Sequence, residues 1–284
     1  MRTCLRGCKA RYDRRMVRVQ ELNFYPLKSG RRITLDAVRV QASGFPWDRH
    51  WMMVDGAGRF LTQRTHPRLA RVRPQLSART LTLNAPGLTP LVLPLEPVGI
   101  PTPVRIWQDD CEGLDQGDEA TGWCSQALEA RARLLRVPRE PARRANPRYA
   151  GSTSVPLAFV DGYPILVCNA ASLQELNTRL DAPIPMERFR PNIVLEGLPA
   201  FAEDHIARVR IGTIVLQLVK PCTRCVIPSI DQSSGTPALD PTPALRAFRF
   251  DRELKGVTFG ENAVPTAGIG AEIRCGDRCE VESD

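Results

Sequence analysis

The stretch Val219-Lys220-Pro221-Cys222-Thr223-Arg224-Cys225 places two thiols and a guanidinium directly after an apolar run. That run, from Ile211 to Val219, is rich in β-branched and aliphatic residues, which predicts a buried or half-buried strand. Pro221 is expected to end the strand, because proline cannot donate a hydrogen bond to a sheet. A thiol beside Arg224 and near Lys220 lies in a positive field, which favours the thiolate that binds metals. We therefore expect the chemistry of the chain to be located here.

The Cys222-x-x-Cys225 spacing alone leaves several interpretations open. A zinc site needs two more ligands, and the later pair Cys275 and Cys279 has a different spacing and lies far along the chain. A redox pair of the thioredoxin type opens a helix, which Pro228 argues against. Both cysteines would also suit buried, inert positions, as free cysteines often do.

Length and composition predict a globular protein of two domains or of one large β-rich unit. The 284 residues are 43% hydrophobic and 25% charged, and the apolar runs are too short to span a membrane. The 25 prolines and 6% aromatic residues predict many short elements. Nine cysteines, an odd number without a signal peptide before them, argue against a disulfide framework and predict a reducing, cytoplasmic location.

The net charge of +8 is spread along the chain, and an anionic small ligand explains it as well as a nucleic acid does. Aromatic residues are not interleaved with the basic ones, so no nucleic-acid partner is expected. The three histidines do not pair at metal-binding spacing, and serine-hydrolase, P-loop and dinucleotide motifs are absent from the sequence.

The chain divides into a disordered basic tail (1–15), an N-terminal β-barrel-like domain (16–140) and a second β-barrel domain with flanking helices (141–284). The fold class expected is mainly β with some α. A strand from Val17 to Phe24 changes its apolar phase near Glu21, which predicts a β-bulge. Residues 51–54 and 60–62 predict a hairpin, and further strands are predicted at 70–76, 80–83, 91–95 and 104–107.

Two helices and one connection complete the sequence-based prediction. One helix is expected from Asp118 to Leu135, and a second begins at a capping box of Ser172 and Glu175. The segment from Arg136 to Arg148 is rich in arginine and proline, and we interpret it as a connection between domains whose arginines are solvated.

Several blocks in a fixed order resemble one family over nearly the whole chain. The blocks are Tyr25-Pro26-Leu27-Lys28-Ser29, Asp48-Arg49-His50-Trp51, Asp161-Gly162-Tyr163-Pro164, Ala171-Ser172-Leu173 with Leu176-Asn177, Arg188-Phe189-Arg190-Pro191-Asn192, Phe201-Ala202-Glu203-Asp204, and Cys222-x-Arg224-Cys225 with Asp231. From about Val17 to Val281 the chain resembles the MOSC family. Within it, the chain is similar to the two-domain branch that contains the amidoxime-reducing component of mitochondria and its bacterial counterparts.

The resemblance implies a molybdenum cofactor (Mo-molybdopterin) between the two domains. Cys225 would supply a thiolate to molybdenum beside the sulfurs of the cofactor, with Cys222 as a neighbour. The cofactor's phosphate would be held by Lys28, Ser29 and Arg49, whose ammonium, hydroxyl and guanidinium suit a phosphoryl group.

Other residues would contact the remaining parts of the cofactor. Arg190 and Asn192 offer the donors and acceptor that a pterin edge needs, and Arg224 would also contact the cofactor. Asp231 would hydrogen-bond near the metal or transfer a proton. Each assignment has a structural alternative: Lys28 as a solvated charge, Arg49 and Arg190 paired with Asp48 or Glu187, and Asn192 capping a turn.

The sequence departs from the family pattern in two places. Ile227-Pro228-Ser229 stands where relatives tend to carry hydroxyl residues, which puts substrate contacts there in doubt, and Cys275 replaces a common aliphatic residue. Many bacterial relatives continue into a ferredoxin-like domain, whereas this sequence stops at Asp284.

The function expected is that of a molybdenum-dependent oxidoreductase, independent of pyridoxal phosphate, that reduces N-hydroxylated or N-oxygenated small molecules. A separate ferredoxin-, flavin- or haem-type protein would donate the electrons, and no membrane association is expected. Two alternatives stay open. One is a non-catalytic carrier of the cofactor or of sulfur, and the other is a four-cysteine zinc or iron–sulfur protein using Cys222, Cys225, Cys275 and Cys279.

Overall fold

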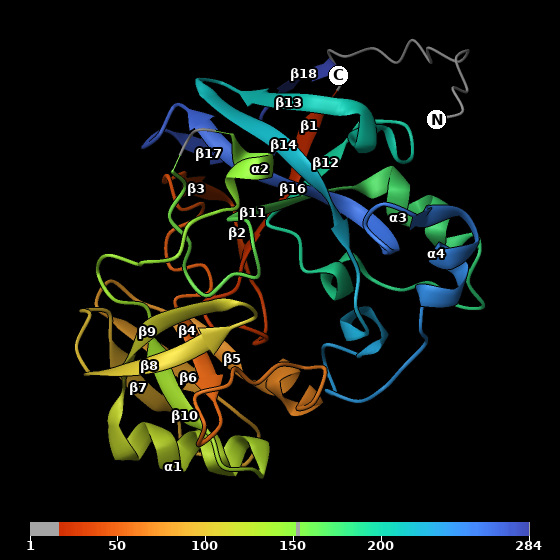
Figure 1. Cartoon of the computed structure of the whole chain (residues 1–284). Coiled ribbons are helices and arrows are strands. Elements are labelled where there is room, and N and C mark those ends of the chain that lie inside the picture. Colours follow the sequence, from red (N-terminus) through yellow and green to blue (C-terminus); the bar gives the residue numbers. More distant parts are fainter. Residues whose placement is uncertain (1–16, 152–153, 284) are drawn as a thin grey trace.

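The computed structural model describes residues 17–151 and 154–283, and the predicted tail at 1–15 lies outside these residues. The fold is mainly β with a few short helices, as expected from the sequence. One large sheet forms the upper body in Figure 1, and two smaller sheets with helix α1 (Gly117–Leu128) form the lower body.

The large sheet contains nine strands from both ends of the chain. Its order is β18-β13-β14-β16-β11-β12-β1-β2, and β15 pairs with β16 beside this path. The strands are β1 (Arg18–Phe24), β2 (Ile33–Leu35), β11 (Ile165–Asn169), β12 (Ile193–Glu196), β13 (Ile206–Ile211), β14 (Ile214–Thr223), β15 (Phe250–Asp251), β16 (Gly256–Ala267) and β18 (Cys279–Ser283). Only β11 and β12 run parallel among these pairs, and alternating apolar residues such as Val19, Leu216 and Val281 fill the core on one face.

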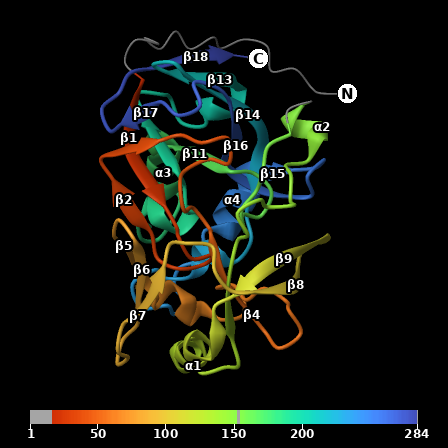
Figure 2. The same cartoon turned by 90° about the vertical axis from the view of Figure 1, so that its left-hand side faces the viewer.

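The smaller body contains two antiparallel sheets that share a separate core. One has the order β4-β10-β9-β8, and the other has the order β5-β6-β7. Their strands are β4 (Trp51–Val54), β5 (Arg73–Leu76), β6 (Thr80–Asn84), β7 (Leu91–Pro94), β8 (Ile100–Ile106), β9 (Asp109–Asp115) and β10 (Arg133–Arg136). Helix α1 covers this core with Trp123, Cys124 and Leu128, as the turned view in Figure 2 shows at the bottom.

The remaining elements connect the two bodies or cover the large sheet. A two-stranded ladder joins β3 (Ala37–Arg39) to β17 (Glu272–Arg274). The helices are α2 (Pro147–Ala150), α3 (Ala170–Asn177), α4 (Thr242–Arg249) and the 3-10 turns Pro67–Arg71, Met186–Phe189, Ala202–His205 and Ile227–Ser229. No helix in residues 17–151 and 154–283 is long and apolar enough to cross a membrane.

The predicted strand before the two cysteines is in fact a hairpin. Gly212, with φ +57, forms the turn between β13 and β14, so Ile211 and Ile214 lie on different strands. The prediction that Pro221 ends the strand was also wrong, because β14 continues to Thr223. Irregular register on both sides of Pro221 accommodates a residue that lacks an N–H.

Both helix predictions need correction. The first helix ends at Leu128, because Glu129 takes a left-handed conformation, and Leu134 lies on β10 instead. The second helix is capped by Asn169, whose side chain accepts from the Ala171 N–H. Ser172 lies inside the helix and donates its hydroxyl to the buried Glu203.

Two of the arginines predicted to be solvated are buried. Arg136 is 3% exposed and lies over the rings of Trp47 and Trp51. Arg143 donates to the backbone carbonyls of Ala158 and Val160, so it fixes the segment that follows the connection. In contrast, the predicted bulge in β1 is confirmed by a register shift between Val19 and Glu21.

The two bodies of the structure do not coincide with the two domains predicted along the chain. Strands β1 and β2 belong to the large sheet, where β1 pairs with β12. Strands β1 and β3 therefore pair with the C-terminal part of the chain, whereas the loop between β1 and β2 contacts the smaller body. The domain boundary near residue 140 stays a prediction.

Candidate active site

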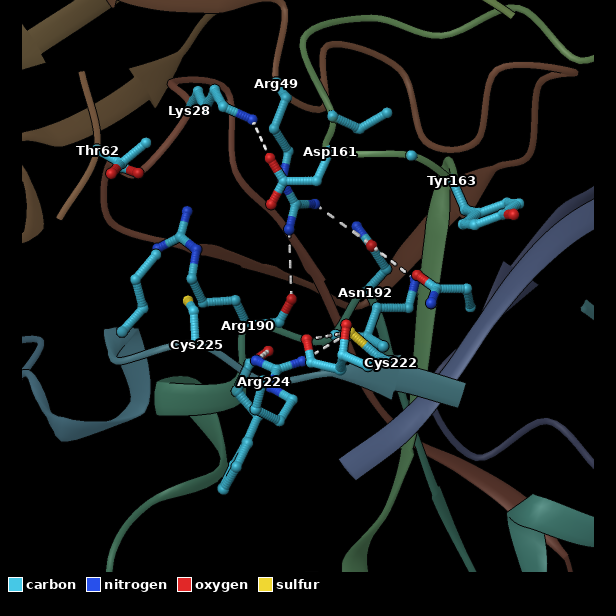
Figure 3. A pocket seen from close by; sticks show the side chains of 18 of the residues that line it. Lys28, Arg49, Thr62, Asp161, Tyr163, Arg190, Asn192, Cys222, Arg224 and Cys225 are labelled. Carbon is cyan, nitrogen blue, oxygen red and sulfur yellow. Dashed lines mark hydrogen bonds and ion pairs between the residues drawn. The ribbon is translucent and has the colours of Figure 1, made fainter. Parts of the chain in front are cut away.

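A cavity lies where the loops of the smaller body face the end of β14 (Figure 3). About 860 Å³ of empty space lies between its walls, and this value includes open solvent. Lys28, Arg49 and Asp161 lie on one side in this view, and Cys222, Arg224 and Cys225 lie on the other. Side chains far apart in the sequence therefore share one site.

The loop after β1 is tied to the start of β4 by backbone hydrogen bonds. The Lys28 N–H donates to the Trp51 carbonyl, and the Trp51 N–H donates to the Pro26 carbonyl. Ser29 and Arg49 both have left-handed backbone conformations, with φ +64 and +53. Such conformations are uncommon for residues other than glycine, and they bring both side chains to the cavity wall.

Lys28 is buried and holds a fixed direction, which rules out the solvated alternative. Its Nζ donates to the Phe159 carbonyl at 2.8 Å and to the Asp161 carboxylate at 2.6 Å. Burial lowers the pKa of Lys28, and the neighbouring Asp161 carboxylate opposes this shift. The Lys28 ammonium thus lies at the cavity wall beside a single carboxylate.

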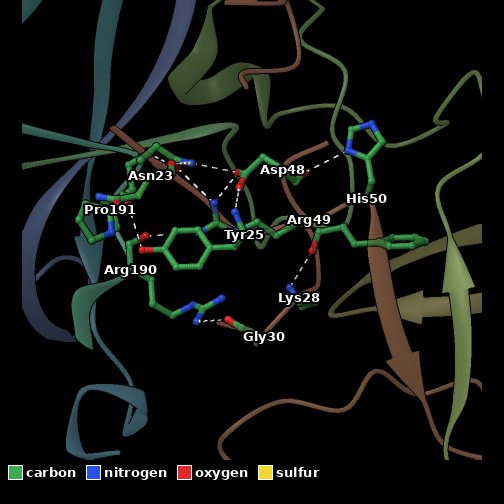
Figure 4. A network of polar contacts seen from close by, with 12 residues as sticks. Asn23, Tyr25, Lys28, Gly30, Asp48, Arg49, His50, Arg190 and Pro191 are labelled. Carbon is green, nitrogen blue, oxygen red and sulfur yellow. Dashed lines mark hydrogen bonds and ion pairs between the residues drawn. The ribbon is translucent and has the colours of Figure 1, made fainter. Parts of the chain in front are cut away.

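Arg49 belongs to a polar network centred on Asp48 (Figure 4). Asp48 is 2% exposed and accepts from Arg49, from the Tyr25 N–H at 2.7 Å and from the Asn192 amide at 3.1 Å. The Arg49 guanidinium also donates to the Asn192 Oδ1 and to the Arg190 carbonyl, each at 3.3 Å. The alternative pairing of Arg49 with Asp48 is therefore present, and it coexists with a position on the cavity wall.

Asn192 uses both ends of its amide within the protein. Its Oδ1 accepts from the Leu166 N–H as well as from Arg49, and its Nδ2 donates to the Asn23 carbonyl and to Asp48. Asn192 lines the cavity, yet its hydrogen bonds fix the position of Arg49.

Arg190 is a buried cation with unused donor capacity. It has a left-handed backbone with φ +59, and its Nη1 donates to the Gly30 carbonyl at 2.7 Å. Its Nη2 is buried without a hydrogen-bond partner among the described residues. Burial lowers the pKa of Arg190 to about 10, and the neighbouring Arg49 adds to this shift. Arg190 forms no ion pair with Glu187, which instead lies 3.3 Å from Arg32 within the described residues.

Arg224 contacts one of the two cysteines at the end of β14. Its Nη2 donates to the Phe189 carbonyl at 2.7 Å, and its Nη1 donates to the Cys222 sulfur at 3.0 Å. Burial raises the pKa of the Cys222 thiol although Arg224 opposes the shift, so the expected preference for thiolate does not hold for Cys222. The half-buried Cys225 lines the cavity, and its thiol makes no hydrogen bond within the described part of the chain.

Asp231 lies outside the set of residues that line this cavity. One carboxylate oxygen accepts from the backbone N–H groups and hydroxyls of Ser233 and Ser234, and the other lies 3.8 Å from Arg188. These hydrogen bonds, the one from the Ser233 hydroxyl first, hold the pKa of Asp231 well below its usual range. Of the eight predicted site residues, the structure brings the other seven together.

Several residues that line the cavity have no role predicted from the sequence. Asp161 and Tyr163 occur in a block that carried the family resemblance, whereas Thr62, Arg64 and Asn262 gave no signal. Arg64 follows a segment that was predicted to be the end of a hairpin, and only the folded chain brings it near Asp161.

The cavity carries an excess of positive charge. Among the described residues, five cations line it against one carboxylate, that of Asp161; the cations are Lys28, Arg49, Arg64, Arg190 and Arg224. The arrangement favours a ligand with several negative charges and a soft, sulfur-binding centre near Cys225.

The four-cysteine alternative is not supported. Within residues 17–151 and 154–283, no group of three or more His, Cys, Asp or Glu side chains could hold a metal ion. Cys275 is exposed and donates to the Leu35 carbonyl, whereas Cys279 is buried and donates to the Asp277 carbonyl.

A β-rich protein of two bodies, with a cationic cavity and a cysteine beside it, matches two family models in succession. Residues 16–131 match the MOSC N-terminal beta barrel domain, and residues 155–280 match the MOSC domain. The chain belongs to the MOSC family, in the branch that contains the amidoxime-reducing components.

Among its relatives is mitochondrial amidoxime-reducing component 1 of Xenopus laevis, which is 32% identical over 91% of this chain and 80% of its own. The corresponding human protein is 31% identical over 86% of this chain and 77% of its own. Mitochondrial amidoxime reducing component 2 of Bos taurus is 32% identical over 82% of this chain and 72% of its own. A solved structure, the YUAD protein from Bacillus subtilis, aligns with 95% of this chain and 98% of its own at 11% identity, with a TM-score of 0.39.

Proposed function

We propose that this protein is a molybdenum-cofactor-dependent reductase of N-hydroxylated and N-oxygenated small molecules. The observation that carries the proposal is the position of the Cys225 thiol in one cavity with five cations. A soft sulfur ligand and several phosphate-binding donors are both needed by a molybdenum cofactor, and few other ligands need the two together. The names of the relatives support the same class of substrate.

The side chains present fit such a cofactor. Lys28, Ser29 and Arg49 would hold its phosphate, and Cys225 would be the thiolate ligand of molybdenum. Arg190 would bind the pterin edge, because its Nη2 has no hydrogen-bond partner among the described residues. The Nε of Arg224 is a second buried donor without a partner there, and it suits the same ligand.

The proposed reaction cleaves an N–O bond. A hydroxylamine or amidoxime takes up two electrons and two protons, and it yields the amine or amidine and one water. When bound, the cofactor supplies the two-electron chemistry, and this chain binds it, orients it and shapes access. Asn192 would position Arg49 for this binding instead of contacting the pterin, because both ends of its amide are already used.

The electrons would come from a separate ferredoxin-, flavin- or haem-type donor protein. The small-molecule substrate would enter at the side of the cavity that is open to solvent. A cytoplasmic location and the absence of membrane and nucleic-acid partners remain predictions of the sequence.

The experiment compares Cys225→Ala with the wild type after expression in a host that makes the molybdenum cofactor. We expect the wild type to contain molybdenum and pterin and to reduce benzamidoxime with a chemical reductant. Cys225→Ala should lose at least about 100-fold in activity, because the proposed ligand of the reactive metal is removed. Cys275→Ser is the matched control, since that thiol is exposed and lies outside the cavity.

Two outcomes would contradict the proposal. If folded Cys225→Ala kept the activity of the wild type, Cys225 would not be the ligand of the metal. Bound pterin without turnover of any N-hydroxylated compound would favour the non-catalytic carrier.

A further inference from the structure

Arg64 is a cation of the cavity wall whose guanidinium makes no hydrogen bond with any residue that the structure describes. It lies between β4 and the 3-10 turn Pro67–Arg71, and its side chain is 24% exposed. Its Nη2 is 3.9 Å from the Asp161 carboxylate, too long for a hydrogen bond. Asp161 already pairs with Lys28 at 2.6 Å, so it neutralises Arg64 only in part.

Trp107 holds this guanidinium from the turn between β8 and β9. The Arg64 Cζ lies 4.7 Å from the centre of the indole ring, a cation–π distance. The indole Nε1 donates to the Asp161 carboxylate at 3.2 Å. The Phe60 ring packs against the indole in an edge-to-face arrangement, with 5.1 Å between the two ring centroids. Trp107 therefore contacts both charged residues at this part of the cavity wall, although it does not line the cavity itself.

Two features of Trp107 are unusual for a residue with only a packing role. Its backbone is left-handed, with φ +56, which is costly for a bulky side chain. Its side chain is also 48% exposed, so burial of apolar surface does not explain the position. The two-residue turn between β8 and β9 requires a left-handed residue at this position, and the tryptophan placed there presents its indole to Arg64.

We propose that Arg64 is a further anion-binding residue of the cavity and that Trp107 is the residue that positions it. When a guanidinium packs its face against an indole, its N–H groups still point outward in the guanidinium plane. There they can donate to a phosphate oxygen. The other phosphate-binding donors are Lys28, Ser29 and Arg49, and the ligand class is a phosphate monoester or inorganic phosphate. The identity of the anion as part of a cofactor rests on the proposed function, whereas the binding of an anion by Arg64 does not.

The test measures the binding of inorganic phosphate to metal-free protein, made in a host that cannot synthesise the pterin. Isothermal titration calorimetry gives the dissociation constant. We expect Arg64→Ala to weaken binding about tenfold, because it removes a charge-assisted hydrogen bond. Arg64→Lys should recover part of the loss because it keeps the charge.

The positioning role of Trp107 is tested by comparing the effect of its substitution on phosphate binding in the presence and absence of Arg64. Trp107→Ala should weaken binding about threefold, whereas Trp107→Phe, which keeps an aromatic face, should stay within about twofold of the wild type. In the Arg64→Ala background, Trp107→Ala should have no further effect, because the two residues act as a unit. Phe250→Ala is the control, since that ring is exposed and does not line the cavity. Thermal unfolding verifies that each variant is folded.

Each result decides between the proposals. Unchanged phosphate affinity in Arg64→Ala, with a loss in Arg49→Ala, would overturn the role of Arg64 and leave the proposed function intact. A further loss on adding Trp107→Ala to Arg64→Ala would overturn the positioning role. A loss at Arg64 in a protein that never takes up molybdenum would support the inference and contradict the proposed function. Failure of the wild type to bind phosphate would overturn the inference and leave the proposed function to the test with Cys225→Ala.

Discussion

At the scale of single residues, the buried carboxylate of Asp48 is the centre of the polar network. It accepts from the backbone of Tyr25, from Arg49 and from Asn192, and it is almost completely shielded from water. Removing one member of a buried charged pair leaves the other charge uncompensated. Asp48 therefore connects the loop after β1 with the end of the segment before β12.

We expect Asp48→Ala to lower the free energy of unfolding by about 3 kcal/mol, the usual cost of breaking a buried ion pair. Urea unfolding measures the change. Glu282→Ala is the control, because its ion pair with Arg208 has both side chains about half exposed and should contribute less than about 1 kcal/mol. Equal effects of the two substitutions would contradict this account of Asp48.

His50 gives the protein a dependence on pH. Burial lowers the pKa of His50 from 6.5 to about 4, although the Asp48 carbonyl opposes the shift. Between these two pH values the unfolded chain binds the proton and the folded chain does not, so stability falls as the pH decreases from 6.5 towards 4. The urea midpoint of His50→Gln should vary less over this window than that of the wild type. Parallel pH profiles would show that other groups cause the acid sensitivity.

At the scale of elements, Gly268 allows β16 to pass close to the hairpin of β13 and β14. Its φ is +72, and a Cβ atom there would lie 2.4 Å from the Thr213 carbonyl oxygen. Side chains are thus excluded for two reasons, the backbone conformation and the close approach.

The two reasons can be separated with a second glycine. Gly270 also has a positive φ, of +89, but a Cβ atom there meets nothing within 4 Å. We expect Gly270→Ala to cost about 1 kcal/mol through backbone strain and Gly268→Ala about 3 kcal/mol or more through strain plus the clash. Thermal or urea unfolding of both variants measures the difference. Similar costs would show that the clash is relieved by a small shift of the hairpin.

The elements also show what the sequence could and could not predict. Local patterns identified some of the strands, such as β1, β4 and β6, and the bulge near Glu21, because side-chain alternation is a property of the strand itself. The end of helix α1 was missed, since Glu129 takes the left-handed conformation without a glycine or proline to mark it. The turn at Gly212 was missed because apolar residues continue on both sides of it.

The candidate site shows the same limit. The family resemblance named seven residues that the structure brings to one cavity, including Lys28 and Cys225. Arg64 and Trp107 were not predicted, because their contact joins segments separated by more than forty residues and no local pattern encodes it. Asp231 is near Cys225 in sequence, yet its carboxylate is occupied by its own turn.

At the scale of the whole molecule, the large sheet depends on the first strands of the chain. β1 contributes Val19, Leu22 and Phe24 to a core made mostly by residues beyond 160, and β2 covers its outer edge. Each buried apolar side chain contributes roughly 1.5–3 kcal/mol, so losing three of them is comparable with the total stability of a domain.

We therefore expect a fragment of residues 141–284 to lack a cooperative unfolding transition, although it contains the predicted second domain. Circular dichroism during urea titration of the fragment and of the full chain measures this. If the transition is lost because β1 and β2 are missing, adding a separate peptide of residues 16–42 should restore part of the change in circular dichroism on unfolding. A cooperative transition of the fragment alone would show that β1 and β2 are dispensable.

The pairing of β1 with β12 and of β3 with β17 has a consequence for how the protein is made. Arg18 is paired with Glu196, and Ala37 is paired with Arg274. Because such contacts join distant parts of the chain, they form slowly and raise the contact order of the fold. On the ribosome, the first strands emerge long before their partners, so their apolar faces stay exposed until nearly the entire chain has been translated.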